Sequence, residues 1–283
     1  MRKKLALALT GVATLFALTA CGGGAATTPS AEATLDPANP TVVKVGSSPI
    51  PQAKILQYID DNLAKDAGID LEITEIDDYL TPNIALDDKT LDANYFQTEA
   101  YLADQVKSKG YKFEHGKGIH VEPLTVFSKT FKDIADVTEG SVVLLNNDPV
   151  NQLRGLRVLE SAGLLTGLED TESALLLDGD DVKNPKKLVF KEVNSEQVPK
   201  FYAEDKTIGL AVINGNYIIQ AKLNLDEVVA QESAIDNPNA NFLTWREGEE
   251  TPAIAKLEEL LHSDEVRDYI KKTWTDGSVI PAF

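Results

Sequence analysis

The stretch SVVLLNNDPVNQLR, residues 141–154, contains the pattern that decides the fold. Its first five residues, 141–145, are mostly β-branched or aliphatic and predict a buried strand. Asp148 and Pro149 then predict the start of a helix, with Asp148 as the N-cap and Pro149 as the first helical residue. Apolar spacing extends this helix over residues 150–164. A strand followed directly by a helix is the repeating unit of α/β proteins.

The same unit recurs along the chain on both sides of this stretch. Expected strands span residues 42–45, 71–76, 92–96, 141–145, 188–193, 208–213 and 242–245. Expected helices span residues 53–63, 101–106, 150–164, 197–202, 217–223 and 253–274, and another begins with Thr81 as N-cap and Pro82 in its first turn. Repeated strand–helix units predict the α/β class, with parallel-rich sheets flanked by helices.

These units form two groups, roughly residues 41–120 and 125–240, which predicts two similar lobes. The last strand and helices most simply return to the first lobe. We therefore expect one lobe from residues 41–122 plus 243–283, and a second from residues 123–242. Ligands of such folds bind beyond the carboxyl ends of strands, here in the cleft between the lobes.

Residues 1–20 have the features of a secretory signal peptide, because basic residues precede an apolar stretch and small residues end it. The apolar stretch, residues 5–20, is shorter than the roughly 18 residues of a membrane-spanning candidate. It ends in Leu-Thr-Ala-Cys, which resembles the lipobox of bacterial lipoproteins. That resemblance implies that Cys21, the only cysteine, is acylated with palmitate-like chains and becomes the mature N-terminus. The alternative is an ordinary signal peptide with an incidental cysteine.

Residues 22–40 are rich in Gly, Ala, Thr and Pro and have no apolar periodicity. Such a composition cannot bury enough surface to offset the entropy of ordering, so it predicts a flexible tether after the lipidated Cys21. The expected location is the cell membrane, with the protein anchored by lipid on its extracytoplasmic face.

Charge and composition exclude several classes of function. The chain has 45 acidic residues against 27 Lys and Arg, a net charge of −18, which argues against nucleic-acid partners and against adsorption to anionic lipid headgroups. The three histidines, His115, His120 and His262, lack the spacing of a helical metal site. The sequence contains no nucleophile elbow, P-loop or dinucleotide-binding glycine motif. We expect no metal, no cofactor and no catalytic residues, and hence no enzyme.

Polar and aromatic residues instead predict a binding site. Asn151 and Arg154 are three residues apart, on one face near the positive end of their helix, where an arginine can hold a carboxylate bidentately. Asn214 follows the expected strand 208–213, and its amide can both donate and accept. Tyr79, Phe96 and Tyr101 also follow strands, and their rings can wall an apolar pocket; ordinary core packing is the alternative.

Motifs along residues 41–283 resemble the NlpA/MetQ-type lipoproteins, the substrate-binding proteins of methionine ABC importers. The resemblance includes Val45-Gly46, Asp78-Tyr79, LDANYFQ at 91–97, HVEP at 120–123, Asn147-Asp148-Pro149, AVINGNY at 211–217 and the ending VIPAF at 279–283. It implies a two-lobed periplasmic-binding-protein fold that encloses an amino acid, most simply L-methionine, and delivers it to the ABC permease. By matched position it implies that Arg154 holds the ligand carboxylate and that Asn151 and Asn214 complete the polar contacts. Tyr79, Phe96 and Tyr101 then line the side-chain pocket.

Two positions depart from the family pattern. The family usually has His where this chain has Thr98, and often His where it has Gln52. Because position 98 lies in the implied pocket, the ligand could instead be a related amino acid or a short methionine-containing peptide. Two further hypotheses are an extracytoplasmic enzyme on the same fold and a surface interaction protein without a ligand.

Overall fold

The computed structural model describes residues 35–168 and 183–283. The expected signal peptide, the lipidated Cys21 and most of the expected tether lie outside the described residues. Residues 35–40, which were expected to end the tether, form a turn in which Asn39 N–H donates to Asp36 O (3.0 Å). Leu35 packs against the hydrophobic core. The folded part therefore begins before the expected residue 41.

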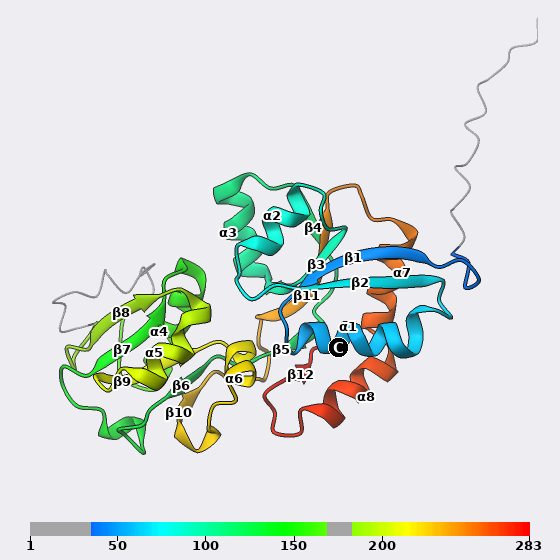
Figure 1. Cartoon of the computed structure of the whole chain (residues 1–283). Coiled ribbons are helices and arrows are strands. Elements are labelled where there is room, and N and C mark those ends of the chain that lie inside the picture. The colour runs from blue at the N-terminus through cyan, green and yellow to red at the C-terminus, as the bar shows by residue number, and fades with distance from the viewer. Residues whose placement is uncertain (1–34, 169–182) are drawn as a thin grey trace, which may run out of the picture. The chain divides into compact units, whose positions relative to one another are not determined.

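The larger sheet organises what we call the first lobe (Figure 1). Its strand order is β12-β5-β11-β3-β1-β2, and β4 pairs with β11 at one side. The strands are β1 (Thr41–Ser47), β2 (Ile69–Glu75), β3 (Ala93–Thr98), β4 (Phe113–His115), β5 (His120–Val121), β11 (Ala240–Arg246) and β12 (Ile280–Pro281). β1 is parallel to β2 and β3, whereas β11 runs antiparallel to β3.

The smaller sheet organises the second lobe. Its order is β10-β6-β9-β7-β8, from β6 (Thr125–Phe127), β7 (Val142–Asn146), β8 (Val189–Val193), β9 (Ile208–Ile213) and β10 (Val228–Gln231). β7 is parallel to both β8 and β9, and β6 runs antiparallel to β9. In the first lobe, β1 thus lies between β2 and β3, and the antiparallel β11 lies beside β3. In the second lobe, β7 lies between β8 and β9, and the antiparallel β6 lies beside β9.

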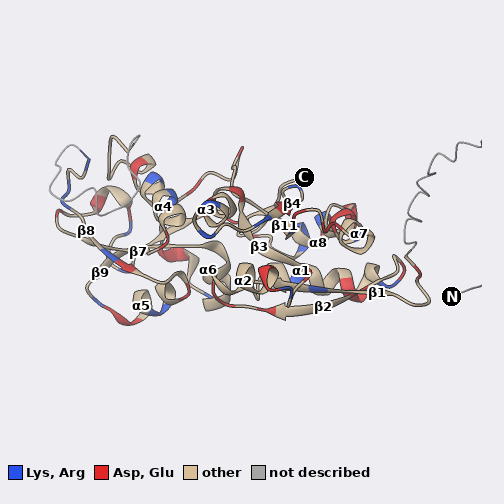
Figure 2. Ribbon diagram, turned by 90° about the horizontal axis from the view of Figure 1, so that it is seen from above, with Lys and Arg blue, Asp and Glu red and all other residues tan. Residues whose placement is uncertain are grey.

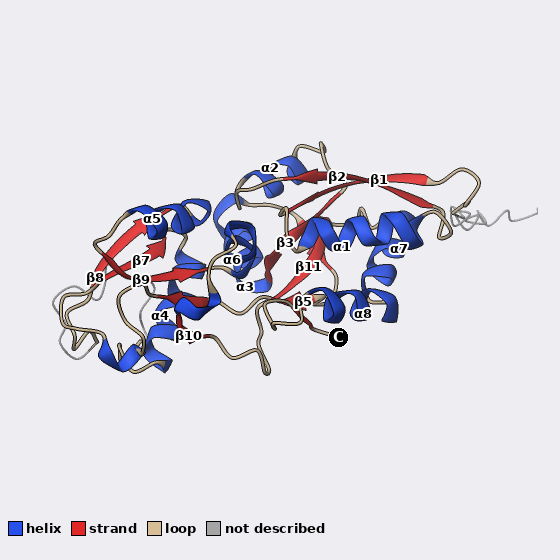
Figure 3. Ribbon diagram, turned by 60° about the horizontal axis from the view of Figure 1, so that its bottom comes forward, coloured by secondary structure: helices blue, strands red, loops and turns tan. Residues whose placement is uncertain are grey.

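Helices cover both sheets (Figure 3). The first lobe contains α1 (Gln52–Ile59), which continues as a π-helical segment (Asp60–Ala64), α2 (Thr81–Asp87), α3 (Glu99–Lys109), α7 (Pro252–Leu261) and α8 (Asp264–Thr273). The second contains α4 (Pro149–Ser161), α5 (Val198–Glu204) and α6 (Gly215–Ala221). Apolar faces of α1, α7 and α8 pack on the first sheet through residues such as Ile55, Leu257 and Ile270, all of which are fully buried.

Helix starts follow local sequence, with one correction. Asp148 caps α4 as expected, and its side chain accepts from Asn151 N–H (2.8 Å). Thr81, expected as the N-cap of its helix, is instead the first residue of α2. The Asp78 carboxylate accepts the N–H groups of Leu80 (2.8 Å) and Thr81 (2.7 Å) in its place. Burial alone would raise the pKa of Asp78, but these hydrogen bonds outweigh it and lower the pKa below its usual value.

Short antiparallel strands were not expected from the sequence. β4, β5, β6, β10 and β12 have two to four residues each, too few to show a period-two pattern. β11 begins at Ala240, three residues before the expected return to the first lobe at residue 243. Residues that end or follow β1, β3, β7 and β9 line one pocket, namely Gln52, Thr98, Asn151 and Asn214.

Acidic residues are scattered over the helices and loops of both lobes (Figure 2). This distribution fits a solvated surface. Across residues 35–168 and 183–283, no helix combines the length and apolarity needed to cross a membrane.

Candidate functional site

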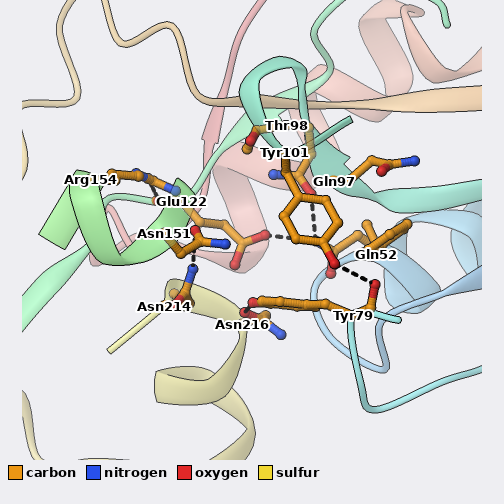
Figure 4. Close-up of a pocket in the computed structure, with 13 residues that line it drawn as sticks. Gln52, Tyr79, Gln97, Thr98, Tyr101, Glu122, Asn151, Arg154, Asn214 and Asn216 are labelled. Carbon is orange, nitrogen blue, oxygen red and sulfur yellow. Dashed lines mark hydrogen bonds between the residues drawn. The ribbon is translucent and has the colours of Figure 1, made fainter. Parts of the chain in front are cut away.

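One pocket lies between residues of the two lobes and holds about 390 Å³ of space, including the part open to solvent (Figure 4). All seven residues expected to bind a ligand line it: Tyr79, Phe96, Thr98, Tyr101, Asn151, Arg154 and Asn214. Six further residues complete the lining: Gln52, Gln97, Glu122, Gly215, Asn216 and Asn241. The seven expected residues therefore lie together, their role in ligand binding stays a prediction, and the other six were not expected as site residues.

The first lobe contributes three aromatic rings to the pocket. Ring centroids lie 6.1 Å apart for Tyr79 and Phe96, 6.1 Å for Tyr79 and Tyr101, and 6.0 Å for Phe96 and Tyr101. The hydroxyl of Tyr101 donates to the carbonyl oxygen of Tyr79 (2.9 Å), and burial raises the pKa of Tyr101, so this hydroxyl stays protonated. The three rings thus form a neutral, fixed apolar wall.

Thr98 is the last residue of β3 and lies at the start of α3. It pairs in register with Asn241 on β11 and is largely buried. It lines the same pocket as the three rings.

The second lobe contributes a chain of side-chain amides, of which Figure 4 shows the link between Asn151 and Asn214. Asn146 Nδ2 donates to Asn214 Oδ1 (3.0 Å), and Asn214 Nδ2 donates to Asn151 Oδ1 (2.9 Å). Asn151 Nδ2 in turn donates to Asp148 Oδ1 (3.1 Å). Because an amide can both donate and accept, the orientation of each one in the chain is set by its neighbours.

Asp148 ends this chain of amides and also caps α4. Burial raises the pKa of Asp148, while hydrogen bonds from the backbone and side chain of Asn151 work in the opposite direction. The carboxylate of Asp148 accepts a hydrogen bond from the backbone N–H of Asn151 at the start of α4, so this N–H already has a partner. An anion in the pocket is therefore met by side chains rather than by this backbone amide.

One edge of the Arg154 guanidinium is hydrogen-bonded to other groups of the protein. Its Nε donates to Glu232 Oε1 (3.0 Å), and its Nη2 donates to Glu232 Oε2 (2.5 Å) and to the carbonyl oxygen of Glu122 (2.9 Å). The expected bidentate grip on a ligand carboxylate is thus taken by Glu232. Within the described part of the chain, no hydrogen bond involves Nη1 of Arg154.

Glu122 brings a carboxylate to the pocket and is buried. Gln52 Nε2 donates to Glu122 Oε1 (2.8 Å), and His120 Nε2 lies 2.8 Å from the same oxygen. The Nδ1 of His120 contacts the hydroxyl of Tyr95, so the network extends into the core of the first lobe. Glu122 lies in the HVEP motif, but only its spatial partners mark it as a pocket residue.

Two buried polar atoms of the pocket lining lack a hydrogen-bond partner among the described residues. They are Gln52 Oε1, an acceptor from the first lobe, and Asn216 Nδ2, a donor from the second. Leaving such a group unpaired costs about 1–3 kcal/mol. A polar ligand that both donates and accepts would remove this cost.

Direct contacts join the lobes beside the pocket. The hydroxyl of Tyr79 donates to Asn216 Oδ1 (2.7 Å), and the hydroxyl of Tyr217 donates to the carbonyl oxygen of Asp77 (2.6 Å). Gly215 permits the close approach of α6, since an added Cβ would lie 2.6 Å from the Cβ of Glu122. The pocket is therefore enclosed from both sides.

No group of three or more His, Cys, Asp or Glu side chains within residues 35–168 and 183–283 is arranged to hold a metal ion. The charged groups of the pocket are Arg154 and Glu122. This pair matches the two opposite charges of a zwitterion.

Comparisons with known proteins agree with the sequence motifs. The family model described as NlpA lipoprotein matches residues 43–283. The methionine-binding lipoprotein MetQ of Bacillus subtilis (strain 168) is 39% identical over 242 residues, which are 84% of this chain and 87% of the relative. These matches confirm the family resemblance.

Solved structures give the same result for the fold. A nutrient-binding protein from Burkholderia cenocepacia bound to methionine has a TM-score of 0.77 at 33% identity, covering 85% of this chain and 100% of its own. The methionine-binding protein MetQ has a TM-score of 0.77 at 30% identity, covering 88% of this chain and 99% of its own. The expected two-lobed periplasmic-binding-protein architecture is confirmed. The chain belongs to the NlpA lipoprotein family.

Proposed function

We propose that this protein is a lipid-anchored, extracytoplasmic solute-binding protein that captures an amino acid, L-methionine, and delivers it to an ABC permease. The pocket carries the proposal, because it combines one guanidinium, one carboxylate and an aromatic wall between two lobes. The methionine-binding relatives support the choice of amino acid.

The charged ends of the ligand are assigned to opposite groups of the pocket. Arg154 Nη1, with the amides of Asn151 and Asn214, meets the α-carboxylate. Glu122 and the unpartnered Gln52 Oε1 accept from the α-ammonium group. A buried charge is costly unless it is paired and hydrogen-bonded, so both ends need these partners when the lobes enclose the ligand.

The side chain of the ligand is assigned to the aromatic wall. Tyr79, Phe96 and Tyr101 offer ring faces and edges, against which a thioether gains about 0.3–1.5 kcal/mol per contact. Thr98 limits this part of the pocket. Because it is smaller than the imidazole that the family usually has there, a related amino acid or a short methionine-containing peptide is the second candidate ligand.

The anchor and the limits of the lobes belong to the same proposal. We assign acylation to Cys21, with residues 22–34 as the tether. One lobe runs from the folded start to residue 122 and resumes at β11, and the other comprises the residues between.

Cys21→Ala is expected to release the protein from membranes or to leave it unprocessed. Unchanged, detergent-requiring membrane association of that variant would contradict the anchor.

The family's role in substrate binding favours a binding protein over an enzyme on the same fold. We assign no catalytic step to Glu122 or Arg154, since both hold fixed protein partners as well as the ligand. Calorimetric titration with the twenty amino acids and several methionyl dipeptides tests the proposal. Saturable binding led by methionine supports it. Chemical turnover of a bound compound, or no binding of any of them, would reject it.

A further inference from the structure

Arg154 and Glu232 lie where the chain passes between the two lobes. Residues 122–124 lead from β5 of the larger sheet to β6 of the smaller one, and residues 232–239 lead from β10 back to β11. Glu232 N–H donates to the carbonyl oxygen of Leu124 (2.8 Å), so the two connections run side by side at this point. Glu122 belongs to the first connection and lines the pocket. Arg154 also lines the pocket and contacts Glu232 of the second connection.

The carboxylate of Glu232 accepts donors from three different segments. Arg154 on α4 donates through Nε and Nη2, Leu124 donates its backbone N–H (3.2 Å), and Asn239 donates its Nδ2 (2.9 Å). The side chains of Arg154 and Glu232 are only 12% and 17% exposed. Burial by itself raises the pKa of Glu232, but the hydrogen bonds and charge of Arg154 outweigh it, so its pKa lies below the usual value and it is ionised at neutral pH.

This arrangement leaves Arg154 a single orientation. An arginine side chain that is free to rotate loses conformational entropy when it is fixed. Here the protein has already fixed it: the Nε–Nη2 edge faces Glu232, Nη2 also reaches the carbonyl oxygen of Glu122, and Nη1 has no hydrogen-bond partner among the described residues.

We propose that Glu232 is a positioning residue for ligand binding, which orients Arg154 so that Nη1 meets the carboxylate of the ligand. The inference rests on the proposed function, because it presumes an amino-acid ligand. Glu232 lies outside the pocket lining, so it acts on Arg154 and not directly on the ligand. The inference also places the carboxylate site at the junction of the two connections, so that the ligand contacts the part of the molecule about which the lobes would move.

Two different roles for Glu232 predict different results. As a competitor of the ligand carboxylate, Glu232 would weaken binding, and its removal would tighten it. As a purely structural link between the connections, it would affect all ligands equally, whether or not Arg154 is present. A double-mutant cycle with two ligands separates these roles from positioning.

The experiment measures calorimetric affinities of the full-length protein, solubilised in detergent, for L-methionine and for methioninamide, which lacks the carboxylate charge. The variants are Glu232→Ala, Arg154→Ala and the double variant. We expect Glu232→Ala to weaken methionine binding about tenfold or more and methioninamide binding less than threefold. In the Arg154→Ala background, the same substitution should change the methionine affinity less than about twofold.

Glu249→Ala is the matched control. Glu249 accepts from Nε of Arg246 (2.6 Å), so this substitution removes another, more exposed Arg–Glu pair, which belongs to the first lobe and does not line the pocket. It should leave both affinities unchanged. Glu232→Gln keeps the length of the side chain and one acceptor oxygen. It serves as the second variant if thermal unfolding shows that Glu232→Ala is not folded, and its expected results have the same pattern.

Tighter or unchanged methionine binding by the folded Glu232 variants would overturn the inference in favour of competition or of no role. An equal loss in both backgrounds, or for both ligands, would overturn it in favour of a structural link. If the parent protein binds no amino acid, the proposed function itself fails, and this outcome is distinct from either result.

Discussion

The wall that the first lobe contributes to the pocket differs in chemistry from the wall that the second lobe contributes. The first contains all three aromatic rings of the lining, Tyr79, Phe96 and Tyr101, together with polar residues such as Gln52 and Glu122. The second is a chain of amides, with Arg154 beside it, whose orientations are fixed by hydrogen bonds. Rings select a ligand by shape, whereas amides and charges select it by which polar groups it carries.

The loss of a charged contact and a change of pocket shape have different effects on the binding free energy. Loss of a buried charge partner typically costs about 2–5 kcal/mol, since the charge of the ligand is then left unpaired. A change of shape in an apolar pocket costs about 1–3 kcal/mol. The substitutions below test whether the two walls differ in this way, from the largest expected effect to the smallest.

Arg154→Ala should weaken methionine binding at least thirtyfold, about 2 kcal/mol or more, because the ligand carboxylate loses its cationic partner. Calorimetry measures the loss. Arg157→Ala is the control, since Arg157 lies on the same helix, is exposed and does not line the pocket. Parent-like binding by the Arg154 variant would mean that the carboxylate is held elsewhere.

Glu122→Gln should weaken methionine binding about tenfold, about 1.4 kcal/mol, because a neutral amide replaces the acceptor assigned to the ammonium group. The side chain keeps its size and one acceptor oxygen. A methionine analogue without the amino group is the matched ligand, and its affinity should not fall. An equal loss for both ligands would show that Glu122 stabilises the pocket rather than contacting the ammonium group.

Thr98→His should change the ranking of apolar ligands by about 1–3 kcal/mol, in favour of methionine if the family pattern encodes that preference. Competitive titrations with methionine, leucine and a methionyl dipeptide give the ranking. The contrast with Arg154→Ala is informative, because that substitution should weaken all three ligands. An unchanged ranking would remove position 98 from the specificity pocket.

Deletion of residues 22–34 should leave ligand affinity within about twofold of the parent, because a tether contributes no pocket wall. Deletion of residues 22–40 should in addition lower the unfolding temperature, since it removes the turn and the packing of Leu35 on the core. Calorimetry and thermal unfolding of the two proteins make the comparison. A tenfold loss of affinity in the shorter deletion would show that the tether takes part in binding.

The central features of the fold were predictable from local sequence. Short β-branched or aliphatic runs located β1, β7 and β9, and helical spacing located α1 and α4, to within a few residues. Asp148 and Pro149 indicated the start of α4, and the three-residue spacing of Asn151 and Arg154 put both on the face that meets the pocket. These features depend on interactions between residues that are close in the chain, so short segments of sequence are enough to predict them.

The remaining features depend on contacts between residues far apart in the chain. Glu122 becomes a pocket residue through Gln52, 70 positions away, and Arg154 is oriented by Glu232, 78 positions away. Strands as short as β5 and β12 exist because they pair with each other and because β5 also pairs with β11, and no pattern within two residues can predict them. Local sequence thus specifies the segments and the residues at their ends. Which polar groups face one another, and which edge of a guanidinium remains open to a ligand, follows only from how the two sheets and their connections pack together.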